Sequence, residues 1–173
     1  MPNRQTLPTI WLFTDQRMGE ALWPAIERVP RGGGVVLRHH RSEQAFGERV
    51  AARCAARGLM LAVAGDVALA QAIGAATVHN PIGTADRLLI SRSVHDMAEA
   101  EAAHDADLVF VSPVFATASH PHGEVLGLDG AMALARRAGM PAVALGGMDR
   151  KRGYAAMAVG FHGWAGIGAF LPS

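Results

Sequence analysis

Eight short apolar runs recur along the chain, and this repetition constrains the fold more than any other feature of the sequence. Each run is nearly continuous in apolar residues, which is typical of parallel strands that are buried on both faces. The runs cover residues 9–14, 34–38, 59–63, 76–79, 88–91, 108–111, 141–145 and 163–167. Eight strand–helix units in a single domain, residues 1–173, predict a compact (β/α)8 TIM barrel. An open, partly wound α/β sheet is the alternative.

The segments between these runs carry helix signals. Helices are expected over 20–29, 42–57, 67–73, 96–104, 129–138 and 149–159. Ser42, Asp66, Asp129 and Asp149 stand where their side-chain oxygens can cap a helix N-terminus.

Two of the eight helices lack room. The chain has 173 residues, whereas about 250 are typical of this barrel. Little space lies between His79 and Leu88, and only three residues follow Phe170, so the fourth and eighth helices are predicted to be short or missing. Uncovered strands would expose apolar surface. We therefore predict a homodimer, or packing of the N-terminal segment, over one of these gaps.

Composition narrows the classes of function. The formal net charge is +1, and the basic residues are scattered and not interleaved with the tryptophans, which gives no support for nucleic-acid binding. No apolar stretch reaches the roughly 20 residues that span a membrane. Cys54 is the only cysteine, its surroundings predict a structural thiol, and nothing resembles a signal peptide, so a cytoplasmic location is expected. Lys151 is the only lysine among sixteen basic residues, so a mechanism that needs two lysines cannot operate in its usual form.

Polar residues gather at the predicted carboxyl ends of the strands, where barrels of this kind carry their active sites. Six of the eight histidines fall there: His39, His40, His79, His95, His120 and His122. A histidine at a strand end is commonly a structural hydrogen-bonding residue. No close spacing such as His-Glu-x-x-His is present, so the pattern does not favour a transition-metal site.

Glycines follow the last two predicted strands. Gly146 and Gly147 come after the seventh strand, and Gly166 and Gly168 after the eighth. Barrels often bind a phosphate at these two places, because glycine lets backbone N–H groups approach the anion and a helix N-terminus adds its dipole. Arg38 could add a bidentate contact. The alternative is that these glycines only relieve crowding at turns.

The loop after the sixth strand carries the most specific motif. Residues 112–115 read Ser-Pro-Val-Phe, residues 117–120 read Thr-Ala-Ser-His, and residues 127–130 read Gly-Leu-Asp-Gly. This order resembles thiamine-phosphate synthases and the related TenI-type proteins, in which the loop reads Gly-Pro-Ile-Phe, Thr-x-Ser/Thr-Lys and Gly-Leu-Asp/Glu-Gly. Similar pieces occur at 36–38 (Val-Leu-Arg), 70–79, 93–95 (Ser-Val-His) and 144–148 (Ala-Leu-Gly-Gly-Met). The resemblance thus extends from the first strand to the last.

The resemblance implies a reaction and a set of site residues. An aminopyrimidine methyl diphosphate would be joined to a thiazole phosphate with release of diphosphate, whose charge Mg2+ and cationic side chains would neutralise. The candidates for catalysis are His95, Ser112, His120 and His122. The candidates for binding the substrates and their phosphates are Arg38, His40, Ser93, Thr117, Ser119, Gly146, Gly147, Gly166 and Gly168.

Several positions depart from the family pattern. The Asn-Asp pair that holds the metal in the family is Ala64 and Gly65 here, and Asp66, one place along, is the remaining candidate ligand. Asn80-Pro81 follows the fourth strand, where the family has a second acidic ligand. The family's two lysines are replaced by His40 and His120. Imidazole is charged only below a pKa of about 6.5, so histidine replaces lysine only in part at neutral pH.

Three functions therefore remain open. The first is a thiamine-phosphate synthase, degenerate where the metal ligands and lysines are replaced. The second is a TenI-like isomerase of a thiazole carboxylate phosphate, which needs no metal and for which His79, His95, His120 or His122 could move a proton; the histidine of TenI proteins in the strand-six motif is Pro113 here. The third is a non-catalytic barrel that binds a phosphate ligand. All three share one fold, which does not decide between them.

Overall fold

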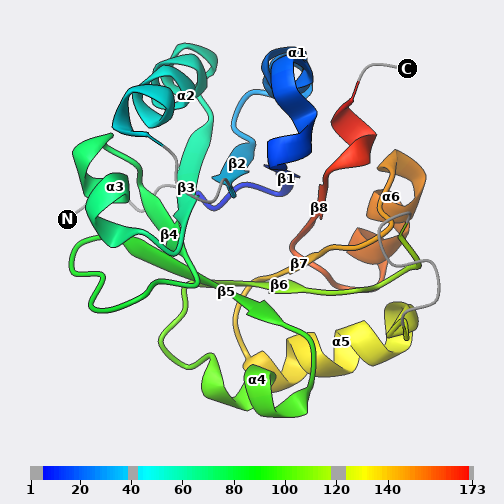
Figure 1. Cartoon of the computed structure of the whole chain (residues 1–173). Coiled ribbons are helices and arrows are strands. Elements are labelled where there is room, and N and C mark those ends of the chain that lie inside the picture. Colours follow the sequence, from blue (N-terminus) through cyan, green and yellow to red (C-terminus); the bar gives the residue numbers. More distant parts are fainter. Residues whose placement is uncertain (1–5, 39–42, 118–123, 172–173) are drawn as a thin grey trace.

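The structure is a computed structural model of the chain, and it describes residues 6–38, 43–117 and 124–171. Eight parallel strands pair in chain order, and the last pairs with the first to close a barrel (Figure 1). The strands are β1 (Ile10–Phe13), β2 (Gly34–Leu37), β3 (Met60–Ala64), β4 (Thr77–His79), β5 (Leu89–Val94), β6 (Leu108–Val111), β7 (Ala142–Ala144) and β8 (Gly163–Gly166). The predicted (β/α)8 barrel is confirmed.

Helices surround the barrel except at two places. They are η1 (Gln16–Ala21), α1 (Leu22–Arg28), α2 (Gln44–Arg57), α3 (Val67–Ala72), α4 (Met97–Ala102), α5 (Gly127–Ala138), α6 (Arg150–Ala158) and η2 (Gly168–Phe170). The fully described stretch from β4 to β5 forms only turns and bends, and in the part of the chain described after β8, up to Leu171, the single 3-10 turn η2 is the only helical element. The two predicted gaps are therefore confirmed.

The capping predictions are confirmed in part. Asp66 accepts a hydrogen bond from Leu69 N–H, and Asp149 accepts one from Arg152 N–H, both at 2.8 Å. The prediction for Asp129 is wrong, because α5 begins two residues earlier, at Gly127. The N–H groups of residues 126 and 127 donate to carbonyls of the strand-six loop, at residues 113 and 114, and this contact fixes the start of the helix. Ser42 lies outside the described residues.

Two apolar clusters fill the molecule, one inside the barrel and one between the barrel and the helices. The inner cluster is centred on the rings of Trp11, Phe13 and Phe110. The ring centroids of Trp11 and Phe13 lie 5.4 and 4.7 Å from that of Phe110, in edge-on contacts. Leu7 packs against this cluster from the amino end, and Trp11 Nε1 donates to the Pro8 carbonyl at 2.8 Å. Residues 6–9 therefore close the amino end of the barrel rather than covering a missing helix.

The outer face of β5, where a fourth helix would pack, carries a polar side chain. Ser91 and Ser93 both hydrogen-bond His79 inside the barrel, so Arg92 between them points outward. Arg92 forms an ion pair with Asp105, with Nε 3.0 Å from Oδ1. A charged pair thus replaces part of the apolar surface that a helix would otherwise have to cover.

Candidate functional site

A cavity of about 1030 Å³ opens at the carboxyl ends of the strands. It brings together four of the predicted site residues, Arg38, Ser93, His95 and Ser112, and Asp66 also lines it. His79 and Asn80 form part of the same wall. These residues come from different strands, yet they meet because parallel strands all end at one rim.

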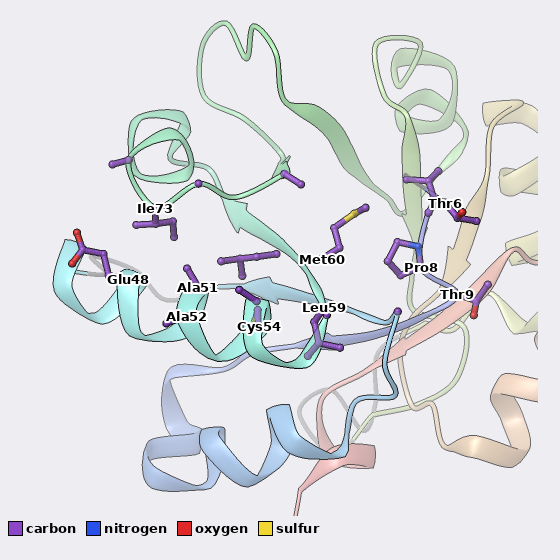
Figure 2. Close-up of a pocket in the computed structure, with 18 residues that line it drawn as sticks. Thr6, Pro8, Thr9, Glu48, Ala51, Ala52, Cys54, Leu59, Met60 and Ile73 are labelled. Atoms are coloured by element: carbon purple, nitrogen blue, oxygen red, sulfur yellow. The ribbon is translucent and has the colours of Figure 1, made fainter. Parts of the chain in front are cut away.

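A second cavity, of about 950 Å³, lies at the opposite end of the barrel (Figure 2). Residues 6–9, the inner side of α2 and the turns before β2, β3 and β4 enclose it. Its walls are mostly small or apolar, with Ala51, Leu59, Met60 and Ile73 prominent, and Glu48 is the one charged residue among the described residues that line it. It offers little acid–base chemistry, so the carboxyl-end cavity is the candidate functional site.

Arg38 is tethered to the first strand at the rim of this cavity. Its backbone N–H donates to Thr14 Oγ1 at 2.9 Å, and its guanidinium lies 3.6 Å from Asp15 Oδ2. Asp15 is also held by Arg17, with Nε–Oδ1 and Nη2–Oδ2 distances of 2.9 and 2.7 Å. The hydrogen bonds from Arg17 hold the pKa of Asp15 well below its usual range, with burial opposing that shift. Arg38 therefore keeps a fixed place while 42% of its side chain stays exposed.

His79 ends β4 inside the barrel and is only 3% exposed. Its Nδ1 lies 3.1 Å from Ser91 Oγ, and its Nε2 lies 3.1 Å from Ser93 Oγ and 3.3 Å from Asn80 Nδ2. Burial, followed by the charges of Arg38 and Arg92 and by His95, lowers the pKa of His79 to about 4. The imidazole is therefore neutral at pH 7.

His95 differs from His79 in exposure and partner. It stands between β5 and α4, with about half of its side chain exposed, and Glu99 Oε2 lies 2.8 Å from its Nδ1. The backbone N–H of His95 donates to the same oxygen at 2.7 Å. Among the described residues none hydrogen-bonds Nε2, so that nitrogen is the one that can meet a ligand in the cavity.

The two glycines after β7 lie against the strand-six loop. Gly146 and Gly147 have φ values of +99° and +61°. A side chain at Gly146 would come 2.8 Å from Pro113 Cα, and one at Gly147 would collide with the Ala116 carbonyl and come 2.9 Å from Phe115 Cβ. The alternative that these glycines relieve crowding thus has direct support, and it leaves the phosphate-binding prediction untested.

Arg152 joins the same two loops from α6. Its Nη1 donates to the Gly147 carbonyl at 2.5 Å, and its guanidinium carbon lies 4.8 Å from the centre of the Phe115 ring. One side chain therefore holds the strand-seven loop against the strand-six loop, whose first described part ends at Thr117.

The remaining predicted residues fall into two groups. Gly166 ends β8 and Gly168 begins η2, where a side chain would meet nothing within 4 Å. Because η2 is a single turn, the expected contribution of a helix dipole after β8 is small. His40, Ser119, His120 and His122 lie outside the described residues.

The described residues do not fit the metal site that the family pattern implies. Mg2+ takes oxygen ligands in octahedral geometry. Ala64 and Gly65 offer no side-chain oxygen, Asp66 Oδ1 caps α3, and Asn80 Oδ1 accepts the Ser93 N–H at 2.9 Å. Residues 6–38, 43–117 and 124–171 contain no group of three His, Cys, Asp or Glu side chains that could hold a metal ion.

Fold and cavity together define a (β/α)8-barrel protein with a candidate ligand site at the carboxyl ends of its strands. Residues 11–170 match the family model described as thiamine monophosphate synthase. The chain is 31% identical to the thiamine-phosphate synthase of Chloroflexus aurantiacus, over 95% of this chain and 85% of the relative. The chain therefore belongs to the thiamine monophosphate synthase family, which has a role in thiamine biosynthesis.

Two further relatives agree with this assignment. The bifunctional protein ThiM/ThiE of Symbiobacterium thermophilum is 35% identical over 71% of this chain, which corresponds to 28% of that longer protein. The structure of a thiamine phosphate pyrophosphorylase from Pyrococcus furiosus superposes with a TM-score of 0.80 at 23% identity, covering 96% of this chain and 89% of that one. At this identity the structural likeness shows the shared fold. No helix in the described part of the chain is long and apolar enough to cross a membrane.

Sequence reasoning did not single out two residues of the site. Asn80 was noted for what it replaces, but its amide bridges to Ser93 through both of its polar atoms. Asp15 directly follows the first predicted strand, and its carboxylate pairs with both Arg17 and Arg38. The alternation Ser91-x-Ser93 opposite His79 was the available sign that a polar network enters the barrel.

Proposed function

We propose that this chain is a thiamine-phosphate synthase that couples an aminopyrimidine methyl diphosphate to a thiazole phosphate in the carboxyl-end cavity. The main support is that Arg38, Ser93, His95 and Ser112, which lie in the segments that resemble the family's motifs, line that one cavity. The phosphate of the thiazole would lie at Gly146, Gly147, Gly166 and Gly168. Thr117 and Ser119 would complete the site from the strand-six loop.

In this reaction the bond between the pyrimidine methylene carbon and a diphosphate oxygen breaks, and its electron pair leaves with the diphosphate. The thiazole nitrogen then donates its lone pair to the cation-like carbon. Arg38 would stabilise the charge that builds on the leaving group. The hydroxyl and amide groups of the wall would orient the two rings so that the reacting atoms meet.

The test is a coupled assay for thiamine phosphate with purified protein, both substrates and Mg2+, with a parallel sample that contains a chelator. We expect turnover, and we expect Arg38→Met to lower kcat/KM by about 100-fold. Arg137→Met is the matched control, because Arg137 lies on α5 and pairs with Glu101 at the surface. Absence of turnover in folded protein would refute the synthase function, and turnover unaffected by the chelator would refute the need for Mg2+.

A metal-independent isomerase acting on a thiazole carboxylate phosphate is the second candidate. The poor fit of Ala64, Gly65, Asp66 and Asn80 to a magnesium site favours it. His95 is the described imidazole that could move the proton at the cavity, alongside His120 and His122 in the loop. Conversion of the thiazole carboxylate phosphate in the presence of chelator, followed by NMR, would support this function. Binding of thiazole phosphate with no turnover in either assay would leave the non-catalytic barrel.

The phosphate site and the homodimer need separate tests. Gly147→Glu should abolish binding of thiazole phosphate in calorimetry, and unchanged affinity would show that the phosphate binds elsewhere.

The homodimer should have twice the chain mass of 18.2 kDa in light scattering. Ile82, which is 84% exposed beside the missing fourth helix, is the residue to change, and Ile82→Asp should yield a monomer. A cytoplasmic location is testable by cell fractionation.

A further inference from the structure

The polar contacts of His79 are numerous enough to fix which nitrogen carries its proton. His79 is held between the rings of Phe13 and Phe110, with centroid distances of 5.3 and 5.4 Å. Both ring nitrogens have polar partners within 3.3 Å. In a neutral imidazole one nitrogen donates and the other accepts, so the chemistry of the partners decides the tautomer.

Asn80 provides the decisive constraint. Its Oδ1 accepts the backbone N–H of Ser93 at 2.9 Å, and a backbone N–H can only donate. The other polar atom of the amide is therefore Nδ2, which can only donate, and it lies 3.3 Å from His79 Nε2. Nε2 must accept, so the proton of the neutral ring is on Nδ1.

The rest of the network agrees with this direction. Asn80 Nδ2 also donates to Ser93 Oγ at 3.0 Å, which leaves the Ser93 hydroxyl to donate its own hydrogen to His79 Nε2, whose one lone pair is shared by the Asn80 and Ser93 donors. On the other side of the ring, Nδ1–H donates to Ser91 Oγ, and Ser91 donates onward to the Val78 carbonyl at 3.5 Å. Every donor in the chain has an acceptor.

We propose that His79 is a positioning residue, held as the Nδ1–H tautomer, that fixes Ser93 and Asn80 in the cavity wall and does not exchange a proton with a ligand. The donor hydrogens of Ser93 and Asn80 are used in hydrogen bonds between these two residues and to the His79 ring. The lone pairs left on Ser93 Oγ and Asn80 Oδ1 are acceptors. This wall therefore suits a ligand group that donates hydrogen bonds, such as an amine, rather than a phosphate.

The positive charges around the His79 ring also oppose the binding of a second proton to it. Arg38 and Arg92 are the cations that act on His79, and His95 is the nearby titratable group. Burial among Phe13 and Phe110 adds to their effect. A second proton on the ring would have to sit on Nε2, where it would face the donor hydrogens of Asn80.

The direct test is NMR of the full chain with 15N-labelled histidine, which reads the tautomer without any assumption about activity. We expect a protonated Nδ1 and an unprotonated Nε2 for His79, unchanged between pH 8 and pH 5. The resonances are assigned as those missing in His79→Gln, or, if that variant does not fold, as those that shift in Ser91→Ala. A proton on Nε2, or a titration near pH 6.5, would overturn the proposal.

A second test separates positioning from proton transfer, and it rests on the proposed function. His79→Gln keeps an acceptor and a donor but cannot titrate, whereas His79→Phe keeps only the ring. We expect kcat/KM within about threefold of wild type for Gln and a loss of about fivefold or more for Phe, as for one lost hydrogen bond. Equal, large losses in kcat for both variants would indicate proton transfer. If the wild type shows no turnover, the proposed function fails, while the NMR result still decides the tautomer.

Discussion

At the scale of single residues, His79 links the stability of the protein to pH. Its pKa is lowered from 6.5 to about 4 in the folded chain, mainly by burial. Between these values the unfolded chain takes up a proton that the folded chain does not, so stability present above pH 6.5 is lost as the pH falls towards 4. The loss should amount to about 3 kcal/mol. Urea unfolding at several pH values should show this slope, and His79→Gln should reduce it. An identical slope in both proteins would contradict the assignment.

Gly147 is a residue at which crowding and backbone strain can be separated. A side chain there would meet the Ala116 carbonyl and Phe115, and φ is +61°. Gly74 has a similar φ of +69° with nothing within 4 Å. We expect Gly74→Ala to cost about 1 kcal/mol of unfolding free energy from strain alone, and Gly147→Ala to cost an additional 1–3 kcal/mol or so from crowding. Equal losses in chemical denaturation would mean that the strand-six loop moves aside freely.

The residue scale also shows what a sequence can reveal about a site. Asp66 and Asp149 were predictable as caps because a cap depends on residues within one turn. The bond from Arg152 to Gly147 and the contact of Arg152 with Phe115 depend on how α6 and two loops meet, which no local pattern encodes. The same holds for Asn80, whose partner Ser93 is on the neighbouring strand.

At the scale of elements, apolar runs located all eight strands, but not all of their ends. β6 has the predicted bounds, because all four of its residues are apolar and buried. β5 extends three residues beyond its predicted end, to Val94. Ser91 and Ser93 both point into the barrel towards His79, and Ser93 occupies an inward position that the hydrophobic pattern assigns to a loop. The polar side chains of this network therefore hid the last part of β5 from a prediction based on apolar runs.

Helix packing gives a prediction in which two glycines should respond in opposite ways. Gly153 lies within α6 against Trp164, and a side chain there would come 2.5 Å from the indole Cγ. Gly130 lies within α5, where a side chain would make an ordinary 3.7 Å contact with Leu126. Alanine in a helix is favoured over glycine by about 1 kcal/mol. We expect Gly130→Ala to raise the thermal midpoint and Gly153→Ala to lower it. A rise in the thermal midpoint of both variants would show that α6 does not pack tightly against β8.

At the scale of the whole molecule, the barrel was predictable because its repeat involves the full chain. The missing fourth helix was predictable from the few residues between His79 and Leu88. What covers its place was not predictable, since Arg92 and Asp105 meet only once β5 and the end of α4 are packed together. The same limit applies to function, because the motifs identify the family while the hydrogen-bond network around His79 exists only in three dimensions.

Closure of the barrel brings β8 against β1 and against Thr9, the residue before it, and this close approach gives the final prediction. Trp164 N–H donates to the Thr9 carbonyl at 2.8 Å, and a side chain at Gly163 would collide with that carbonyl and come 2.6 Å from Thr9 Cα. A closed barrel has no edge strands, whereas an opened one exposes two, which promote aggregation. We expect Gly163→Ala to lose at least about 3 kcal/mol of unfolding free energy and to aggregate in light scattering. Gly168→Ala, where a side chain meets nothing within 4 Å, is the matched control and should remain dispersed. If both variants unfold like the wild type, the pairing of β1 with β8 cannot be what holds the barrel closed.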